Sequence, residues 1–252
     1  MKIVAIIQAR MSSTRLPGKV LKDICGKPML WHIHNRLRHA KLVDQVVIAT
    51  SNRKSDVPIV RFAEENEIPC YAGSELDLLD RWNKAIKKFK ADAVVRVTGD
   101  CPLADPTIVD KVVKYYLEKG PFDFVSNSRP KATYPDGLDV EIYAAKALEK
   151  AWKEIRDPFL REWGSANFFE HPEKYSLANL ENNEDLSHMR WTVDYQDDLD
   201  FVREIYRRLY RQDSIFLMED ILNLLNKYPE LMKINKSHVG QDSYKEALGR
   251  RD

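Results

Sequence analysis

Apolar runs and amphipathic stretches alternate along the first half of the chain. Residues 1–7 form a short run rich in β-branched side chains, which predicts a buried parallel strand. Residues 28–40 then show helical spacing. The same alternation predicts further strands at 45–50, 69–72, 93–97 and 122–126, and further helices at 57–66, 76–90 and 108–119. This β-α-β-α order predicts an α/β fold, a mostly parallel sheet with helices on both faces and right-handed crossovers.

The second half has a less regular pattern. It predicts strands at 140–143, 175–180 and 189–193, and helices at 144–155, 159–169, 199–210 and 218–227. The pattern contains no repeat and no flexible linker, so we expect a single domain over residues 1–236. Residues 237–252 are polar and predict a frayed tail.

The composition narrows the classes of partner. Among the 252 residues, 40 Lys and Arg balance 39 Asp and Glu, which argues against a nucleic-acid or membrane-surface role. No apolar stretch approaches the length of a membrane span, and the opening run is too short for a signal peptide. The cysteines, Cys25, Cys70 and Cys101, lack metal-like spacing and indicate reduced thiols. We therefore expect a cytoplasmic protein.

The segment directly after the first strand, residues 8–19, combines cations, hydroxyls and a Pro-Gly turn. Loops at the carboxyl ends of strands are where α/β sheets bind ligands, and Arg10, Arg15, Lys19 and backbone N–H groups suit a polyphosphate. The alternative is a solvated basic turn, but the position after the first strand favours the phosphate site.

Two aspartates follow apolar segments in a way that suits a metal. Asp100 comes just past the predicted strand at 93–97, and Asp105 is better placed than Asp100 to cap the next helix, so Asp100 is available for Mg²⁺. Asp194 ends a similar segment, although the acidic residues after it also suit a helix start. A shared Mg²⁺ site requires both carboxylates to meet beside the basic loop.

A second pair of carboxylates lies at Asp139 and Glu141, after the turn signal Pro135-Asp-Gly137. Residues two apart point to the same side of a strand, so this pair is a candidate for binding a polar acceptor or a cation. The alternatives are a simple turn and an ion pair between Glu141 and an arginine.

Together these motifs resemble the cytidylyltransferases that make CMP-activated sugars, most closely the branch of the spore coat polysaccharide biosynthesis protein F, beside the CMP-Kdo and CMP-sialic acid synthetases. The resemblance is carried, in order, by residues 8–19 (QARMSSTRLPGK), 96–102 (RVTGDCP), 134–141 (YPDGLDVE) and 190–194 (RWTVD).

The resemblance implies a nucleotide-diphospho-sugar-transferase fold (GT-A-like and Rossmann-like), with CTP over the amino-terminal half of the sheet. It places Arg10 and Lys19 on the triphosphate, and Asp100 and Asp194 on Mg²⁺, and implies catalytic roles for these four residues. The residues implied to bind the nucleotide are Gln8, Ala9, Arg10, Ser12, Ser13, Arg15, Lys19 and Thr98.

On the acceptor side, the resemblance implies binding by Asp139, Glu141 and Glu162. Residues 161–165 (REWGS) replace a Glu-His-Val-Thr-Pro-like stretch of that branch and keep only Glu162. Two classes of acceptor therefore remain: the acidic sugar that the relatives use, and a smaller hydroxyl compound. The irregular segment of about 130–190 is the expected acceptor or dimerisation region, which implies a homodimer.

The implied reaction is attack of an acceptor hydroxyl on the α-phosphorus of CTP, with release of pyrophosphate. Three alternatives stay open: a transferase using another nucleoside triphosphate, a glycosyltransferase using a nucleotide sugar, and a nucleotide-binding regulatory module. The glycosyltransferase alternative is weakened because Asp100-Cys-Pro lacks the second carboxylate of an Asp-x-Asp motif.

Overall fold

The sheet is built around β1 (Ile3–Gln8), whose side chains alternate between two apolar cores. The structure is a computed structural model that describes residues 1–241 and 247–249. Ile3, Ala5 and Ile7 enter one core, whereas Val4 and Ile6 enter the other. All five are buried, which is what a strand covered by helices on both faces requires.

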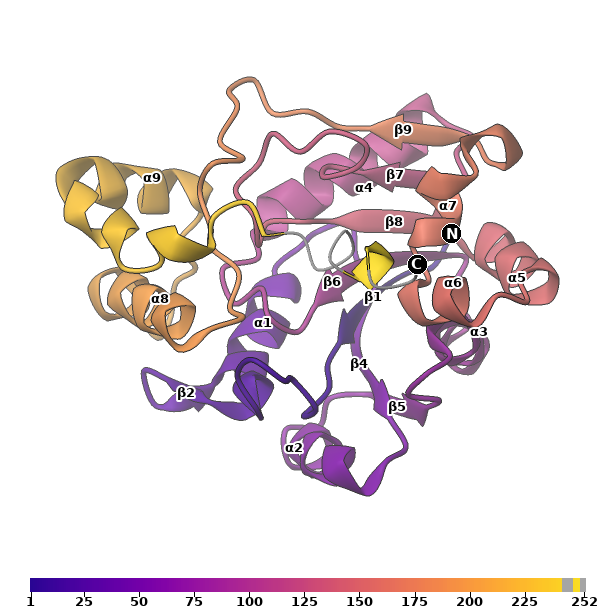
Figure 1. The fold of residues 1–252 in the computed structure, drawn as a ribbon, viewed down its shortest axis with the longest axis horizontal. Coiled ribbons are helices and arrows are strands. Elements are labelled where there is room, and N and C mark those ends of the chain that lie inside the picture. The colour runs from indigo at the N-terminus through magenta and orange to yellow at the C-terminus, as the bar shows by residue number, and fades with distance from the viewer. Residues whose placement is uncertain (242–246, 250–252) are drawn as a thin grey trace.

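Seven strands form this sheet in the order β5-β4-β1-β6-β8-β7-β9 (Figure 1). The pairs β4–β5, β1–β4, β1–β6 and β7–β9 are parallel, and β8 runs antiparallel to both of its neighbours. The other strand bounds are β4 (Gln45–Ser51), β5 (Cys70–Gly73), β6 (Ala93–Thr98), β7 (Phe124–Ser126), β8 (Glu141–Ala144) and β9 (Leu177–Asn179). The predicted mostly parallel α/β sheet is confirmed.

Helices cover both faces, as predicted. One face carries α1 (Met29–Leu37), α2 (Val57–Glu65), α4 (Pro106–Lys119), α8 (Gln196–Leu209) and α9 (Met218–Lys227). The other carries α3 (Leu78–Phe89), α5 (Ala145–Glu154) and α7 (Ala166–Glu170), with α6 (Pro158–Trp163) packed on α3. Figure 1 shows α1, α8 and α9 to the left of the sheet and α3 and α5 to its right.

Short 3₁₀ helices and one hairpin complete the described fold. The hairpin, β2 (Asp23–Ile24) with β3 (Lys27–Pro28), was not predicted. The 3₁₀ helices are η1 (Lys19–Leu21), η2 (Lys54–Asp56), η3 (Pro172–Lys174), η4 (Pro229–Lys233) and η5 (Lys236–His238). Over the described residues, no helix is long and apolar enough to cross a membrane.

The structure corrects two of the sequence predictions and describes only part of a third. The helix predicted at 159–169 is broken into α6 and α7 at Gly164, whose φ of +38° is outside the helical region. Gly164 packs so closely on Trp82 that an added Cβ would lie 2.6 Å from the ring. The predicted tail begins with η5, and its residues 242–246 and 250–252 lie outside the described part.

The strand predicted at 189–193 is also wrong. Only an isolated bridge joins Arg190 to Asp136. The Trp191 N–H donates to the Asp136 carbonyl (2.6 Å), and the Val193 N–H donates to the Asp100 carbonyl (2.8 Å). This segment therefore crosses the carboxyl ends of the strands instead of joining the sheet.

Gly137 is where the 134–139 turn meets that crossing segment. Its φ is +109°, and an added Cβ would lie 2.6 Å from the Thr192 nitrogen and 2.7 Å from the Trp191 carbonyl carbon. A side chain there would push the two segments apart.

We expect Gly137→Ala to lower the free energy of unfolding by about 3 kcal/mol or more, measured by urea denaturation. Gly26 is a matched control because its φ is +81° but nothing lies within 4 Å of an added Cβ. Gly26→Ala should cost only the backbone term of about 1–2 kcal/mol. Equal losses in the two variants would contradict the close contact at Gly137.

Candidate active site

The site lies where the chain leaves β1 and β6. β1 pairs with β4 on one side and with β6 on the other, so the strand order reverses here. The Gly99 N–H donates to the Gln8 carbonyl (2.8 Å), which joins the two loops that follow these strands. A crevice at such a reversal is the usual ligand site of an open α/β sheet.

A buried carboxylate fixes the backbone of the basic loop. Asp56 is fully buried and accepts hydrogen bonds from the Met11 N–H (2.8 Å) and the Ser51 hydroxyl (2.5 Å). The Gly18 N–H donates to the Met11 carbonyl (3.1 Å) and closes the loop, and the Ser13 hydroxyl accepts from the Leu16 N–H (3.3 Å). The loop backbone is thus held in place by the protein alone.

Lys19 joins the basic loop to both predicted metal ligands. Its ammonium donates to Asp100 Oδ2 (2.7 Å), to Asp194 Oδ1 (2.8 Å) and to the Val193 carbonyl (2.8 Å). Lys19 is only 7% exposed. The structure therefore brings the two distant aspartates together on one nitrogen, beside the loop after β1.

Two arginines also bind Asp194. Arg15 pairs with Oδ1 at 2.8 Å, and Arg190 donates to Oδ2 at 3.1 Å. Arg190 is 4% exposed and donates as well to Asp136 (3.0 Å) and to both oxygens of Asp198 (2.9 and 3.0 Å). Both oxygens of the Asp194 carboxylate are therefore held by cations.

Asp198 anchors the start of α8 beneath this site. It is fully buried, and it accepts from the backbone N–H groups of Asp194 (2.9 Å) and Tyr195 (3.0 Å). The Asn235 amide donates to Asp198 (2.9 Å) and to the Arg190 carbonyl (3.0 Å). These bonds fix the backbone that carries Asp194.

The charges of this cluster reinforce one another. Burial lowers the pKa of Lys19, but the charges and hydrogen bonds of Asp100 and Asp194 outweigh it, so the net pKa is raised. Burial opposes ionisation of the two aspartates, yet Lys19, with Arg15 at Asp194, holds their pKa values below the ordinary range. Ammonium and carboxylates are consequently all charged at neutral pH.

The donor set suits Mg²⁺, since carboxylate and carbonyl oxygens are the hard ligands it prefers. Asp100, Asp194 and the Val193 carbonyl all reach one point. The part of the chain that the structure describes holds no cluster of three or more His, Cys, Asp or Glu side chains that could bind a metal. Water or ligand oxygens would complete such a coordination shell, and Lys19 would have to give way.

The predicted acceptor carboxylates sit in a second polar cluster. Glu141 accepts from Arg96 (2.7 Å) and from the Tyr143 hydroxyl (2.5 Å), and the Arg96 guanidinium also donates to the Gln8 side chain (3.1 Å). Glu141 is therefore in the ion pair considered as an alternative. Burial, followed by the charges of Asp136 and Glu141, raises the pKa of Asp139 to about 7.

The remaining predicted residues are spread around these clusters. The Thr98 hydroxyl contacts the Cys101 sulfur (3.0 Å), and the Ser12 hydroxyl donates to Glu75 (3.1 Å). Ala9 is buried, whereas Arg10 and Glu162 are exposed. The roles expected of the individual site residues stay predictions.

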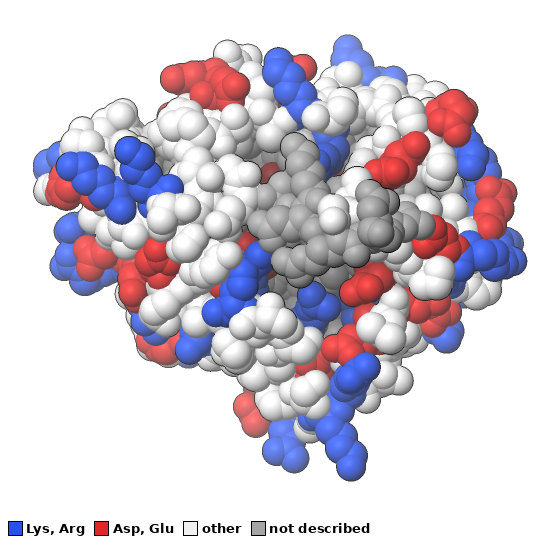
Figure 2. Space-filling model, viewed as in Figure 1, with Lys and Arg blue, Asp and Glu red and all other residues white. Residues whose placement is uncertain are grey.

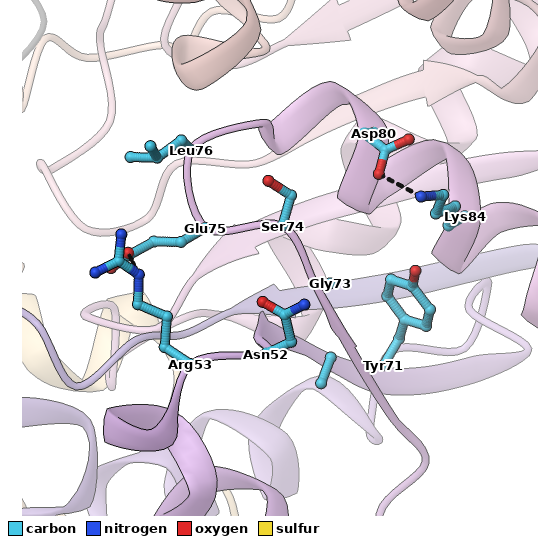
Figure 3. Close-up of a pocket in the computed structure, with 10 residues that line it drawn as sticks. Asn52, Arg53, Tyr71, Gly73, Ser74, Glu75, Leu76, Asp80 and Lys84 are labelled. Carbon is cyan, nitrogen blue, oxygen red and sulfur yellow. Dashed lines mark ion pairs between the residues drawn. The ribbon is translucent and has the colours of Figure 1, made fainter.

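A pocket of about 410 Å³ opens beside the loop, at the carboxyl ends of β4 and β5 (Figure 3). Figure 3 shows the ion-paired Arg53 and Glu75 on one side and the Asp80–Lys84 pair (2.8 Å) on the other. Glu75, in the wall of the pocket, also accepts the hydrogen bond from Ser12, which joins this wall to the basic loop.

Four residues of the site carried little sequence signal. Asp56 and Asp198 lie near predicted helix starts, where acidic residues are ordinary, and Asn235 lies between predicted elements. Arg190 lies in the predicted strand and in the motif 190–194, but nothing in the sequence indicates which carboxylates it binds. Arg190, Asp194 and Asp198 are spaced four residues apart, a spacing that would place them on one face of a helix and so near one another. The helix begins only at Gln196, so Arg190 and Asp194 precede it and this signal would mislead. Their pairing depends on how the chain returns to the site.

The chain matches a family model described as cytidylyltransferase over residues 4–236. It is 36% identical to an uncharacterised protein of Methanocaldococcus jannaschii over 250 residues, covering 98% of this chain and 99% of that protein. It is 29% identical to the spore coat polysaccharide biosynthesis protein SpsF of Bacillus subtilis, covering 90% of this chain and 95% of the relative.

Two further comparisons agree with these matches. A 3-deoxy-manno-octulosonate cytidylyltransferase of Geotalea uraniireducens is 37% identical over 118 residues, covering 47% of this chain and 46% of that protein. The solved structure of a cytidylyltransferase from Leptospira borgpetersenii superposes with a TM-score of 0.87 and 31% identity, covering 96% of this chain and 98% of that one. The resemblance seen in the sequence motifs is confirmed.

Asp139 gives a pH-dependent prediction. Its pKa of about 7 in the folded protein exceeds the ordinary 3.8, so the folded state binds the proton more tightly. The stability that Asp139 contributes is therefore fully present below about pH 4 and is lost as the pH rises through about 7, the sign expected for a raised folded pKa. Asp139→Asn removes this loss, and its stability relative to wild type should rise by at least about 1 kcal/mol between pH 5 and pH 8.

The measurement is urea denaturation of both proteins at the two pH values. Asp213→Asn, at an exposed position, is the control and should follow wild type at both. A stability difference between wild type and Asp139→Asn that does not change with pH would contradict the raised pKa.

Proposed function

The chain belongs to the cytidylyltransferase family, and on that premise we propose that it transfers CMP from CTP to a hydroxyl of a small acceptor and releases pyrophosphate. The observation that carries the proposal is the meeting of Asp100 and Asp194 at Lys19, next to a basic loop whose backbone the protein already holds in place. Carboxylates for a metal and cations for phosphates are the two parts that nucleotidyl transfer needs.

The triphosphate is proposed to lie on residues 8–19, against the loop N–H groups and the side chains of Arg10, Arg15 and Lys19. The nucleoside would extend toward the pocket at the ends of β4 and β5, which Ser12 and Glu75 connect to the loop. Figure 2 shows Lys and Arg interspersed with Asp and Glu over the face in view.

In the proposed reaction the acceptor hydroxyl oxygen attacks the α-phosphorus, and the bond from that phosphorus to the bridging oxygen of the β-phosphate breaks. Bound Mg²⁺, held by Asp100 and Asp194, would supply Lewis-acid stabilisation of the phosphate charge. Lys19 and Arg10 would stabilise the negative charge that develops on the departing pyrophosphate. The protein mainly positions groups and balances charge, as in other phosphoryl transfers.

The acceptor is proposed to bind on the side of β8, near Asp139, Glu141 and Glu162. Glu141 already forms an ion pair with Arg96, so this pair adds no net charge toward an acceptor. An acidic sugar, as the name of the Geotalea relative indicates for that protein, and a smaller hydroxyl compound both stay within the proposal. A cytoplasmic homodimer joined through about residues 130–190 likewise stays a prediction.

A panel of substrates tests the proposal. Purified protein with Mg²⁺ is offered CTP, UTP, GTP or ATP with acidic sugars and with small polyols, and pyrophosphate release is measured. We expect release with CTP in the presence of one acceptor class. Release with another triphosphate, or transfer from a nucleotide sugar without pyrophosphate, would replace the CTP-dependent reaction by one of the alternatives.

Replacing Asp100 tests the shared carboxylate site. Asp100→Asn keeps the shape but removes the charge that would bind Mg²⁺, so kcat should fall by about a hundredfold or more. Asp200→Asn is the control, at an exposed position on α8, and should keep wild-type kcat. Unchanged turnover in folded Asp100→Asn would remove Asp100 from the mechanism.

A further inference from the structure

The Lys19 ammonium stands at the point where the two carboxylates meet. It has three N–H donors, and all three are used, on Asp100, Asp194 and the Val193 carbonyl. Those same oxygens are the protein ligands that a divalent ion would use. A metal and the ammonium therefore cannot bind these three oxygens at the same time.

The charge of the cluster is already nearly balanced without a metal. Lys19, Arg15 and Arg190 face the carboxylates of Asp100, Asp194, Asp136 and Asp198. Adding a divalent ion would leave an excess of positive charge in a largely buried place, which is unfavourable. A nucleotide triphosphate entering with the ion would cancel that excess.

We propose that Lys19 is a resident cation that holds Asp100 and Asp194 together in the nucleotide-free protein and keeps divalent metal out until the nucleotide arrives. The proposal rests on the proposed function, because the phosphates that draw Lys19 away belong to the proposed substrate. The flexible four-carbon stem of lysine allows the ammonium to exchange carboxylate partners for phosphate oxygens. The metal then enters with the nucleotide, into a pair of carboxylates that is already assembled.

The structure separates this role from a general effect of positive charge. Arg15 binds the same oxygen of Asp194 as Lys19 does, at the same 2.8 Å, whereas it is Lys19 that also bonds to Asp100. Removing Arg15 takes away one positive charge but leaves the Lys19 ammonium between Asp100 and Asp194. Removing Lys19 takes away the same charge and also the group that occupies the position between the two carboxylates. Lys22, in the same turn, is a control for changing a lysine there.

The test measures Mn²⁺ binding without nucleotide, because Mn²⁺ favours the same oxygen ligands and its free ion is counted by electron paramagnetic resonance. We expect wild type and Lys22→Gln to bind weakly and Lys19→Gln to bind about tenfold more tightly or better, since a charge-assisted competitor is gone. Arg15→Gln should change the affinity several-fold less than Lys19→Gln. Asp194→Asn added to Lys19→Gln should abolish the gain.

Wild-type affinity equal to that of Lys19→Gln would overturn the proposal, and so would an equal gain in Arg15→Gln. If Lys19→Gln does not fold, Lys19→Met replaces it, and the rise in melting temperature on adding Mn²⁺ should exceed that of wild type. In a second arm, the non-hydrolysable α,β-methylene analogue of CTP should restore tight Mn²⁺ uptake by wild type. If the CTP analogue does not restore Mn²⁺ binding while the variants behave as expected, the protein uses another nucleotide and the proposed function is wrong. The measurements without nucleotide decide the role of Lys19 independently.

Discussion

The structure depends on the attraction between the Lys19 ammonium and the carboxylates of Asp100 and Asp194. Two partly buried carboxylates that approach one point repel each other unless a cation lies between them. Lys19 provides that cation from the loop after β1, and so joins three segments that are distant in the sequence. The pKa of the lysine is raised and those of the aspartates are lowered, which keeps all three charged at neutral pH.

The rest of the site supports this ion cluster from behind. Asp56 holds the basic loop through the Met11 N–H, and Asp198 holds the backbone at Asp194 and Tyr195. Buried charges are costly unless every hydrogen-bonding group has a partner, and Arg190 provides partners for several carboxylates at once. A rigid arrangement of charge in the free protein lowers the cost of organising the site when a substrate binds.

The fold explains why these residues meet at one edge of the sheet. β1 and β6 are adjacent and parallel, so the loops after them open on the same side. The segment around Arg190 crosses the strand ends and brings Asp194 to them, and it packs against Gly137 so closely that no side chain fits there. The family model matches the chain through this segment, over residues 4–236.

The sequence by itself determined the alternation of strands and helices, the basic loop after β1 and the family, because burial patterns and short motifs are local in the chain. It predicted a strand at 189–193 and one helix at 159–169, where the tertiary structure has a crossing segment and a break at Gly164 against Trp82. Only the tertiary structure decided which charges pair: that Lys19 lies between two aspartates, that Glu141 pairs with Arg96, and that Asp56 and Asp198 are anchors. The physical reason is that an ion pair depends on where distant segments return in space, and the residue pattern of each segment contains no information about that return.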